Sequence, residues 1–191
     1  MTDPLHRLDR RRTALVVIDL QERLLPAVVY AARVTRATRL LLRAATVLDL
    51  PVVSTTQYEK GLGPTVGEIA ELLPARTARL DKTAFSCFDD ARFEGLLAAA
   101  APGAATLLVA GVESHICVAG TVFGALRNRL AVEVVTDAVS SRGVGDSEVG
   151  LRRMERGGAL LTCSEMAVYE LLGGSGTAEF KEMLPYFKGE P

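Results

Sequence analysis

The 191-residue chain has no tryptophan, two histidines and three cysteines, and aromatic residues make up 5% of it. Three cysteines are too few, and odd in number, for a disulfide scaffold, which favours a reduced, cytoplasmic protein. No stretch approaches the ~18–20 apolar residues that cross a bilayer. The apolar run 14–18, which follows a basic start, is too short for a secretory signal. These absences argue against a membrane protein and a secreted one.

The composition itself is that of a folded domain. Hydrophobic residues make up 49% of the chain and charged residues 24%, with a net charge of −1. This balance excludes disorder, and the length predicts a single domain over residues 1–191. A near-neutral chain also argues against a protein devoted to nucleic acid or to an anionic membrane. We expect its partners to be a small-molecule substrate and further copies of itself.

Short β-branched runs alternate with longer segments in which apolar residues recur every three or four positions. The short runs predict strands at 13–19, 52–56, 79–84, 106–112, 132–136 and 159–162. The longer segments predict helices at 28–50, 90–100, 115–129, 146–156 and 165–172, with a short one at 68–73. This alternation predicts an α/β fold in three layers, with helices on both faces of a six-stranded, mainly parallel sheet. Ligands in such folds bind beyond the carboxyl ends of the strands, where strand order reverses.

The segment 173–191 is separate from this pattern. A glycine-rich joint at 173–176 precedes a predicted helix whose apolar stripe consists of Phe180, Met183, Leu184 and Phe187. Two interpretations are open. The helix closes over its own domain, or it is an arm that docks on a neighbouring subunit.

Three reactive side chains stand at predicted strand ends. Asp19 ends the first strand, Lys82 lies on the third, and Cys117 lies in the first turn of the helix after the fourth. Unpaired amides at a helix start favour a thiolate there. Singly, Asp19 could cap a turn, Lys82 could be a solvated charge, and Cys117 could be a small buried residue. Together they form an acid, a base and a nucleophile at the edge where ligands are expected.

Six segments carry a family resemblance: VVIDLQERLLP, TTQYEKGLGPTV, KTAFSCF, LLVAGVESHICV, EVVTDAVSSR and GALLTCSE. Between residues 13 and 172 the chain resembles the isochorismatase-like cysteine hydrolases, and within them the small isochorismatase-domain hydrolases. The resemblance implies a parallel sheet in the order 3-2-1-4-5-6 and a triad of Asp19, Lys82 and Cys117. It also implies a cis peptide between Val112 and Glu113, which would turn amides near Ile116 and Cys117 toward a developing oxyanion.

The chemistry that the resemblance implies is hydrolysis of a small amide or related acyl compound through a thioester on Cys117, without a cofactor. Family nicotinamidases bind a metal through an Asp-x-His after the second strand. The sequence here is Ser54-Thr55-Thr56-Gln57-Tyr58, so we expect no metal. One alternative is an isochorismatase-type vinyl ether hydrolase that uses Asp19. Another is a catalytically idle interaction module. We expect a homo-oligomer, a dimer or a tetramer.

Further residues follow the predicted strands and are candidates for a substrate pocket: Gln57, Tyr58, Phe85, His115 and Arg142. For the aromatic rings the alternative is core packing, for His115 a polar helix start, and for Arg142 an ordinary ion pair. Cys87 and Cys163 are predicted to be buried thiols. Arg33, Arg36, Arg39 and Arg43 share one face of the first helix, which we expect to be solvated, although it could contact an acidic partner or nucleic acid.

Overall fold

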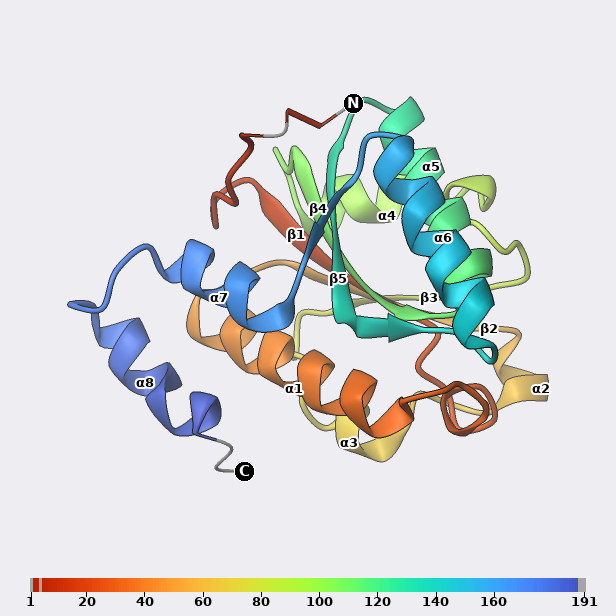
Figure 1. Ribbon diagram of the computed structural model, residues 1–191, viewed down its shortest axis with the longest axis horizontal. Helices are drawn as coiled ribbons and strands as arrows, with labels where there is room; N and C mark the ends of the chain where they lie inside the picture. The colour runs from red at the N-terminus through yellow and green to blue at the C-terminus, as the bar shows by residue number, and fades with distance from the viewer. Residues whose placement is uncertain (1, 4, 189–191) are drawn as a thin grey trace.

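Six parallel strands form one sheet in the order β3-β2-β1-β4-β5-β6 in the computed structural model, which describes residues 2–3 and 5–188 (Figure 1). This confirms the predicted architecture and strand order. The strands are β1 (Thr13–Ile18), β2 (Val52–Gln57), β3 (Ala78–Lys82), β4 (Thr106–Val112), β5 (Ala131–Ser140) and β6 (Leu160–Thr162). Because β1 pairs with both β2 and β4, the winding of the chain reverses between β1 and β4, and their carboxyl ends mark the expected ligand site.

Helices cover both faces of the sheet. The helices are α1 (Ala31–Val47), α2 (Glu59–Leu62), α3 (Gly67–Ala70), α4 (Phe93–Ala100), α5 (Ala119–Arg127), α6 (Val144–Arg156), α7 (Ser164–Leu172) and α8 (Ala178–Phe187). Alternate residues of β1 point to opposite faces. Leu15 and Val17 join the apolar core beneath α1 and α7, whereas Val16 and Ile18 join the core beneath α4 and α5.

Several predicted boundaries are wrong for local reasons. The helix predicted from residue 28 begins at Ala31, because Tyr30 has a left-handed backbone (φ 58°). The helix predicted from residue 115 starts as a π-helical turn, η3 (Ser114–Val118), and becomes α5 only afterwards. β5 runs to Ser140, four residues further than predicted. The short helix α2 follows a second left-handed residue, Tyr58.

The tail packs on its own chain in this structure. Met183 of α8 is fully buried, and Phe180 and Phe187 pack against the core beneath α1 and α7. Tyr169 of α7 contacts both rings, with centroids 6.0 Å from Phe180 and 4.7 Å from Phe187. A role for α8 as an arm between subunits stays a prediction.

None of the helices in the described part of the chain combines the length and the apolar character that crossing a membrane requires.

Candidate active site

Asp19 lies directly after the central strand β1 and is fully buried. Its backbone turns into a left-handed conformation (φ 53°), and its N–H donates to the Thr55 carbonyl at 3.1 Å. The adjacent strand comes very close here. A Cβ at Gly111 would lie 2.1 Å from the Ile18 carbonyl oxygen, so only glycine fits. The backbones of β1 and β4 are therefore tightly packed directly before Asp19.

A buried ion pair joins Asp19 to Lys82. The Lys82 ammonium donates to Asp19 Oδ2 at 2.7 Å and to Gln57 Oε1 at 2.7 Å. The Thr55 hydroxyl donates to Asp19 Oδ1 at 2.7 Å. Burial is the largest single influence and lowers the pKa of Lys82, but the charge and hydrogen bond of Asp19 and the nearby sulfurs of Cys117 and Cys87 together outweigh it, so the pKa is raised. Each charge of the pair therefore has two hydrogen-bond partners, which offset part of the cost of its burial.

Cys117 lies in the π-helical turn after β4 and is 6% exposed. Burial raises the pKa of its thiol to about 12, the Asp19 carboxylate adds to the rise, and Lys82 opposes it. These surroundings do not favour the predicted thiolate at a helix start. The helix start is π-helical and buried, and a carboxylate lies beside the sulfur. Both influences favour the protonated thiol.

The peptide bond between Val112 and Glu113 is cis. The Glu113 carboxylate accepts hydrogen bonds from the Arg142 backbone N–H at 2.8 Å and from its Nε at 3.0 Å. Arg142 therefore forms an ion pair with Glu113, which was the alternative to a place in the substrate pocket. The Ile116 N–H, a predicted oxyanion donor, donates to the Glu113 carbonyl at 3.0 Å. It would have to leave that partner in order to bind an oxyanion.

The remaining predicted pocket residues occupy different surroundings. Gln57 belongs to the triad network through Lys82. His115 instead pairs its Nδ1 with the Ser141 hydroxyl at 2.9 Å. Its backbone packs closely against α6, since a Cβ at Gly150 would lie 3.0 Å from His115 Cα. Tyr58 and Phe85 are exposed, at 52% and 64%. Neither ring is a core residue, so core packing is wrong for both.

Two polar residues of the network, Gln21 and Thr55, were not predicted from the sequence. Gln21 is fully buried, and its amide Nε2 donates to the Gln57 and Gly63 carbonyls at 3.2 and 2.6 Å. Its Oε1 accepts the Gln57 N–H at 2.7 Å. Thr55 holds Asp19 as described above. A signal for Gln21 was present, since it follows Asp19 by two residues in VVIDLQ.

The other two thiols differ from each other. Cys87 is fully buried, as predicted, and burial raises its pKa to about 11. Cys163 is exposed, so its predicted burial is wrong. It lies at the start of α7, where β6 emerges from the sheet. Across residues 2–3 and 5–188, no three or more histidine, cysteine, aspartate or glutamate side chains are grouped to hold a metal ion.

Comparison with known proteins identifies the family. The model of the isochorismatase domain matches residues 13–166. The chain belongs to the isochorismatase family. Isochorismatase domain-containing protein 2 of Xenopus laevis is 35% identical over 178 residues, covering 93% of this chain and 84% of that protein.

Solved structures of similar proteins share the isochorismatase-family fold. A Caenorhabditis elegans protein, described as MAR1 ribonuclease, superposes with a TM-score of 0.89 at 37% identity and covers 96% of this chain and 93% of its own. YcaC of Pseudomonas aeruginosa, solved with hexane-2,5-diol and covalent acrylamide, gives 0.88 at 27% identity, with coverages of 97% and 93%. YcaC of Escherichia coli, described as an octameric hydrolase of unknown specificity, gives 0.87 at 26%, with coverages of 98% and 96%.

Proposed function

We propose that this isochorismatase-family hydrolase is a metal-independent cysteine hydrolase of a small amide or related acyl compound. The observation that carries the proposal is the ion pair of Asp19 and Lys82, 2.7 Å long and withdrawn from solvent, beside the Cys117 thiol. A carboxylate can accept more hydrogen bonds than the two that hold Asp19. Asp19 therefore has capacity to take the thiol proton while Lys82 and Thr55 hold it in place.

In the acylation step the Cys117 proton moves to Asp19 as the sulfur forms a bond to the carbonyl carbon. The positive charge of Lys82 offsets the negative charge that develops on sulfur and oxygen. Backbone amides near Ile116 and Cys117 stabilise the oxyanion, with the Ile116 N–H leaving the Glu113 carbonyl to do so; such a contribution is ~3–4 kcal/mol per donor in other enzymes. The carbon–nitrogen bond then breaks, and Asp19 returns its proton to the leaving amine.

Deacylation repeats the sequence with water. Asp19 takes a proton from the water molecule whose oxygen attacks the thioester carbon. The carbon–sulfur bond breaks, and the proton passes from Asp19 to the Cys117 sulfur, which restores the resting thiol. The acid leaves, and no cofactor takes part. One carboxylate thus serves both half-reactions, which requires that it keep one position throughout.

The burial of the nucleophile favours a small substrate. Cys117 is 6% exposed, whereas Tyr58 and Phe85 on neighbouring loops are largely exposed. We place Gln57, Tyr58, Phe85, His115 and Arg142 around the entrance, and a compact acyl group fits this arrangement better than a polynucleotide. The covalent acrylamide in the solved structure of YcaC from Pseudomonas aeruginosa supports a reactive nucleophile in the family.

We also propose that the protein is a homo-oligomer in a reducing compartment, the cytoplasm. The octameric YcaC of Escherichia coli supports association of this fold. All three cysteines are free thiols in the described chain, which suits a reducing environment. Sedimentation of the purified protein tests the oligomer, and a monomer at micromolar concentration would contradict it.

A panel of small amides, thioesters and vinyl ethers tests the proposed reaction. We expect hydrolysis of an amide or thioester, an acyl adduct on Cys117 in peptide mass spectrometry, and a loss of about a thousandfold or more in Cys117→Ala. Asp19→Asn should lose the activity as well. Ether cleavage that survives Cys117→Ala but not Asp19→Asn would favour the vinyl ether hydrolase instead. If no compound is hydrolysed and deletion of the residues after Gly176 disrupts an oligomer, the catalytically idle interaction module becomes the favoured interpretation.

A further inference from the structure

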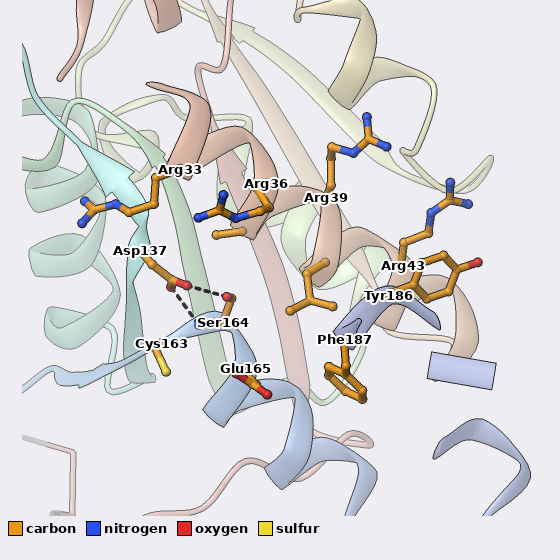
Figure 2. A pocket seen from close by; sticks show the side chains of 12 residues that line it. Arg33, Arg36, Arg39, Arg43, Asp137, Cys163, Ser164, Glu165, Tyr186 and Phe187 are labelled. Atoms are coloured by element: carbon orange, nitrogen blue, oxygen red, sulfur yellow. Dashed lines mark hydrogen bonds between the residues drawn. The ribbon is translucent and has the colours of Figure 1, made fainter. Parts of the chain in front are cut away.

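A cavity of about 500 Å³ lies between α1, the start of α7 and the end of α8 (Figure 2). We call this cavity the arginine groove, because one of its sides is lined by four arginines of α1: Arg33, Arg36, Arg39 and Arg43. The four residues repeat every three or four positions, so they lie on one helix face. Over ten residues this face extends ~15 Å. The prediction of a simply solvated face is therefore incomplete, because these arginines border a cavity.

The four guanidinium groups are not equally engaged. Arg39 lies 3.8 Å from Glu68, Arg43 stacks on the Tyr186 ring at 5.1 Å, and Arg33 lies over the Tyr30 ring at 4.9 Å. Within the described residues, no carboxylate oxygen comes within salt-bridge distance of Arg33 or Arg36, and both side chains are exposed. Figure 2 shows the two side chains extending in the same direction, with Arg36 above Asp137 and Ser164 and with Arg33 pointing away from the start of α7. This end of the groove therefore carries two cations without an anionic partner.

The acidic residues of the groove do not cancel this charge. Asp137 accepts hydrogen bonds from the Ser164 N–H at 2.8 Å and from its hydroxyl at 2.5 Å, and so caps α7 (Figure 2). Asp137 and Glu165 are the two acidic residues of the lining, which also contains four arginines. The remaining amides of the first α7 turn add partial positive charge.

The opposite end of the groove is aromatic and apolar. Tyr186 and Phe187 of α8 form its wall (Figure 2), and Leu40 of α1 also belongs to the lining of the cavity. The lining thus changes along its length, from unpaired guanidinium groups to ring faces. Guanidinium groups bind phosphate oxygens in pairs, and ring faces stack on flat groups. The volume lies within the ~300–1,000 Å³ usual for sites of small molecules.

We propose that the arginine groove binds a phosphate monoester carried on a flat ring, the chemical class of the mononucleotides. The phosphate lies between Arg33 and Arg36, and the ring lies against Phe187. None of the residues that line the groove belongs to the triad or to its hydrogen-bond network, so the site is separate from the proposed hydrolytic one.

Calorimetry with adenosine 5′-monophosphate, adenosine and inorganic phosphate tests the proposal on the full-length protein. We expect the nucleotide to bind at least about tenfold more tightly than adenosine or phosphate alone, a difference of about 1.4 kcal/mol. Arg33→Gln with Arg36→Gln should weaken nucleotide binding at least about tenfold, and Phe187→Leu should weaken it less. Arg152→Gln with Arg156→Gln, an exposed pair on α6, removes the same charge and should leave binding unchanged.

Several outcomes overturn the proposal. One is no binding of the nucleotide at about 1 mM, and another is equal losses in the two double variants, which would show a general charge effect. A ten-residue RNA that binds far more tightly than the mononucleotide, and loses this in Arg33→Gln/Arg36→Gln, would make the groove a polynucleotide surface. A change of oligomeric state in that variant, without nucleotide binding, would make it a subunit interface.

Discussion

Two buried carboxylates, at opposite ends of the sheet, have opposite surroundings. Asp19 follows the carboxyl end of β1, is fully buried, and contacts the Lys82 ammonium at 2.7 Å. Glu133 lies near the amino end of β5 and is 4% exposed. Burial raises its pKa to about 7, and the nearby Glu170 adds to the rise. The Lys82 ammonium stabilises the charged Asp19 carboxylate, whereas no cation lies within salt-bridge distance of Glu133 among the described residues.

The largest expected effect is the loss of Lys82. In Lys82→Met the Asp19 carboxylate stays buried without its cation, which costs about 3–5 kcal/mol of the free energy of unfolding. Urea denaturation measures the loss. The exposed pair of Arg10 and Glu179 is a control, because Arg10→Ala should cost no more than about 1 kcal/mol.

A second substitution separates charge from packing at the same place. Lys82→Met combined with Asp19→Asn should recover part of the lost stability, because no unpaired charge then stays buried. Equal losses in the single and double variants would mean that Lys82 acts through its packing alone.

Removing the Glu133 carboxylate should raise the free energy of unfolding instead of lowering it. The pKa of Glu133 is higher in the folded than in the unfolded chain, so the folded state holds its proton more tightly. Its contribution therefore lowers stability as pH rises from about 4.5 to about 7, by at most about 3 kcal/mol. Glu133→Gln should remove this slope and raise the free energy of unfolding at pH 7.5.

Denaturation of both proteins at pH 5 and pH 7.5 gives the comparison, and Glu170→Gln should reduce the slope partly. A wild type and a Glu133→Gln variant with the same slope would show that Glu133 finds compensating partners.

A smaller effect is expected for Gln21. Gln21→Leu leaves the Gln57 N–H and two carbonyls without their hydrogen bonds, which costs about 1–3 kcal/mol. Because Gln57 also holds Lys82, turnover should fall more than the affinity for substrate. Thr38→Val is a control: the buried Thr38 hydroxyl has no hydrogen-bond partner in the described chain, so stability should change little. Unaltered turnover in a folded Gln21→Leu would exclude a positioning role.

Much of this arrangement could be predicted from the sequence, because strand periodicity is a local signal. The runs at 13–19 and 106–112 gave the central strands nearly to the residue. That these two strands are neighbours, with Asp19 and Cys117 at adjacent strand ends, was implied by the family resemblance and its strand order 3-2-1-4-5-6, not by the strand pattern itself.

The remainder depends on contacts between distant segments. The role of Gln21 depends on its hydrogen bond to the Gly63 carbonyl, which lies on a loop distant in the sequence. The proton state of Cys117 depends on burial and on Asp19, which a helix-start argument does not include. The arginine groove needs α8 to return over α1, and the spacing of the arginines alone fits a solvated face equally well.

The most direct measurement is the pH dependence of Cys117 alkylation by iodoacetamide, followed by peptide mass spectrometry in wild type and Asp19→Asn. In wild type the Cys117 rate should keep rising toward the thiol pKa of about 12, without a plateau near neutral pH. Asp19→Asn removes the neighbouring negative charge and leaves Lys82, so the midpoint should fall to lower pH while hydrolysis is lost. The exposed Cys163 is the internal reference. A wild-type plateau near neutral pH, or identical profiles in the two proteins, would contradict Asp19 as the proton acceptor of Cys117.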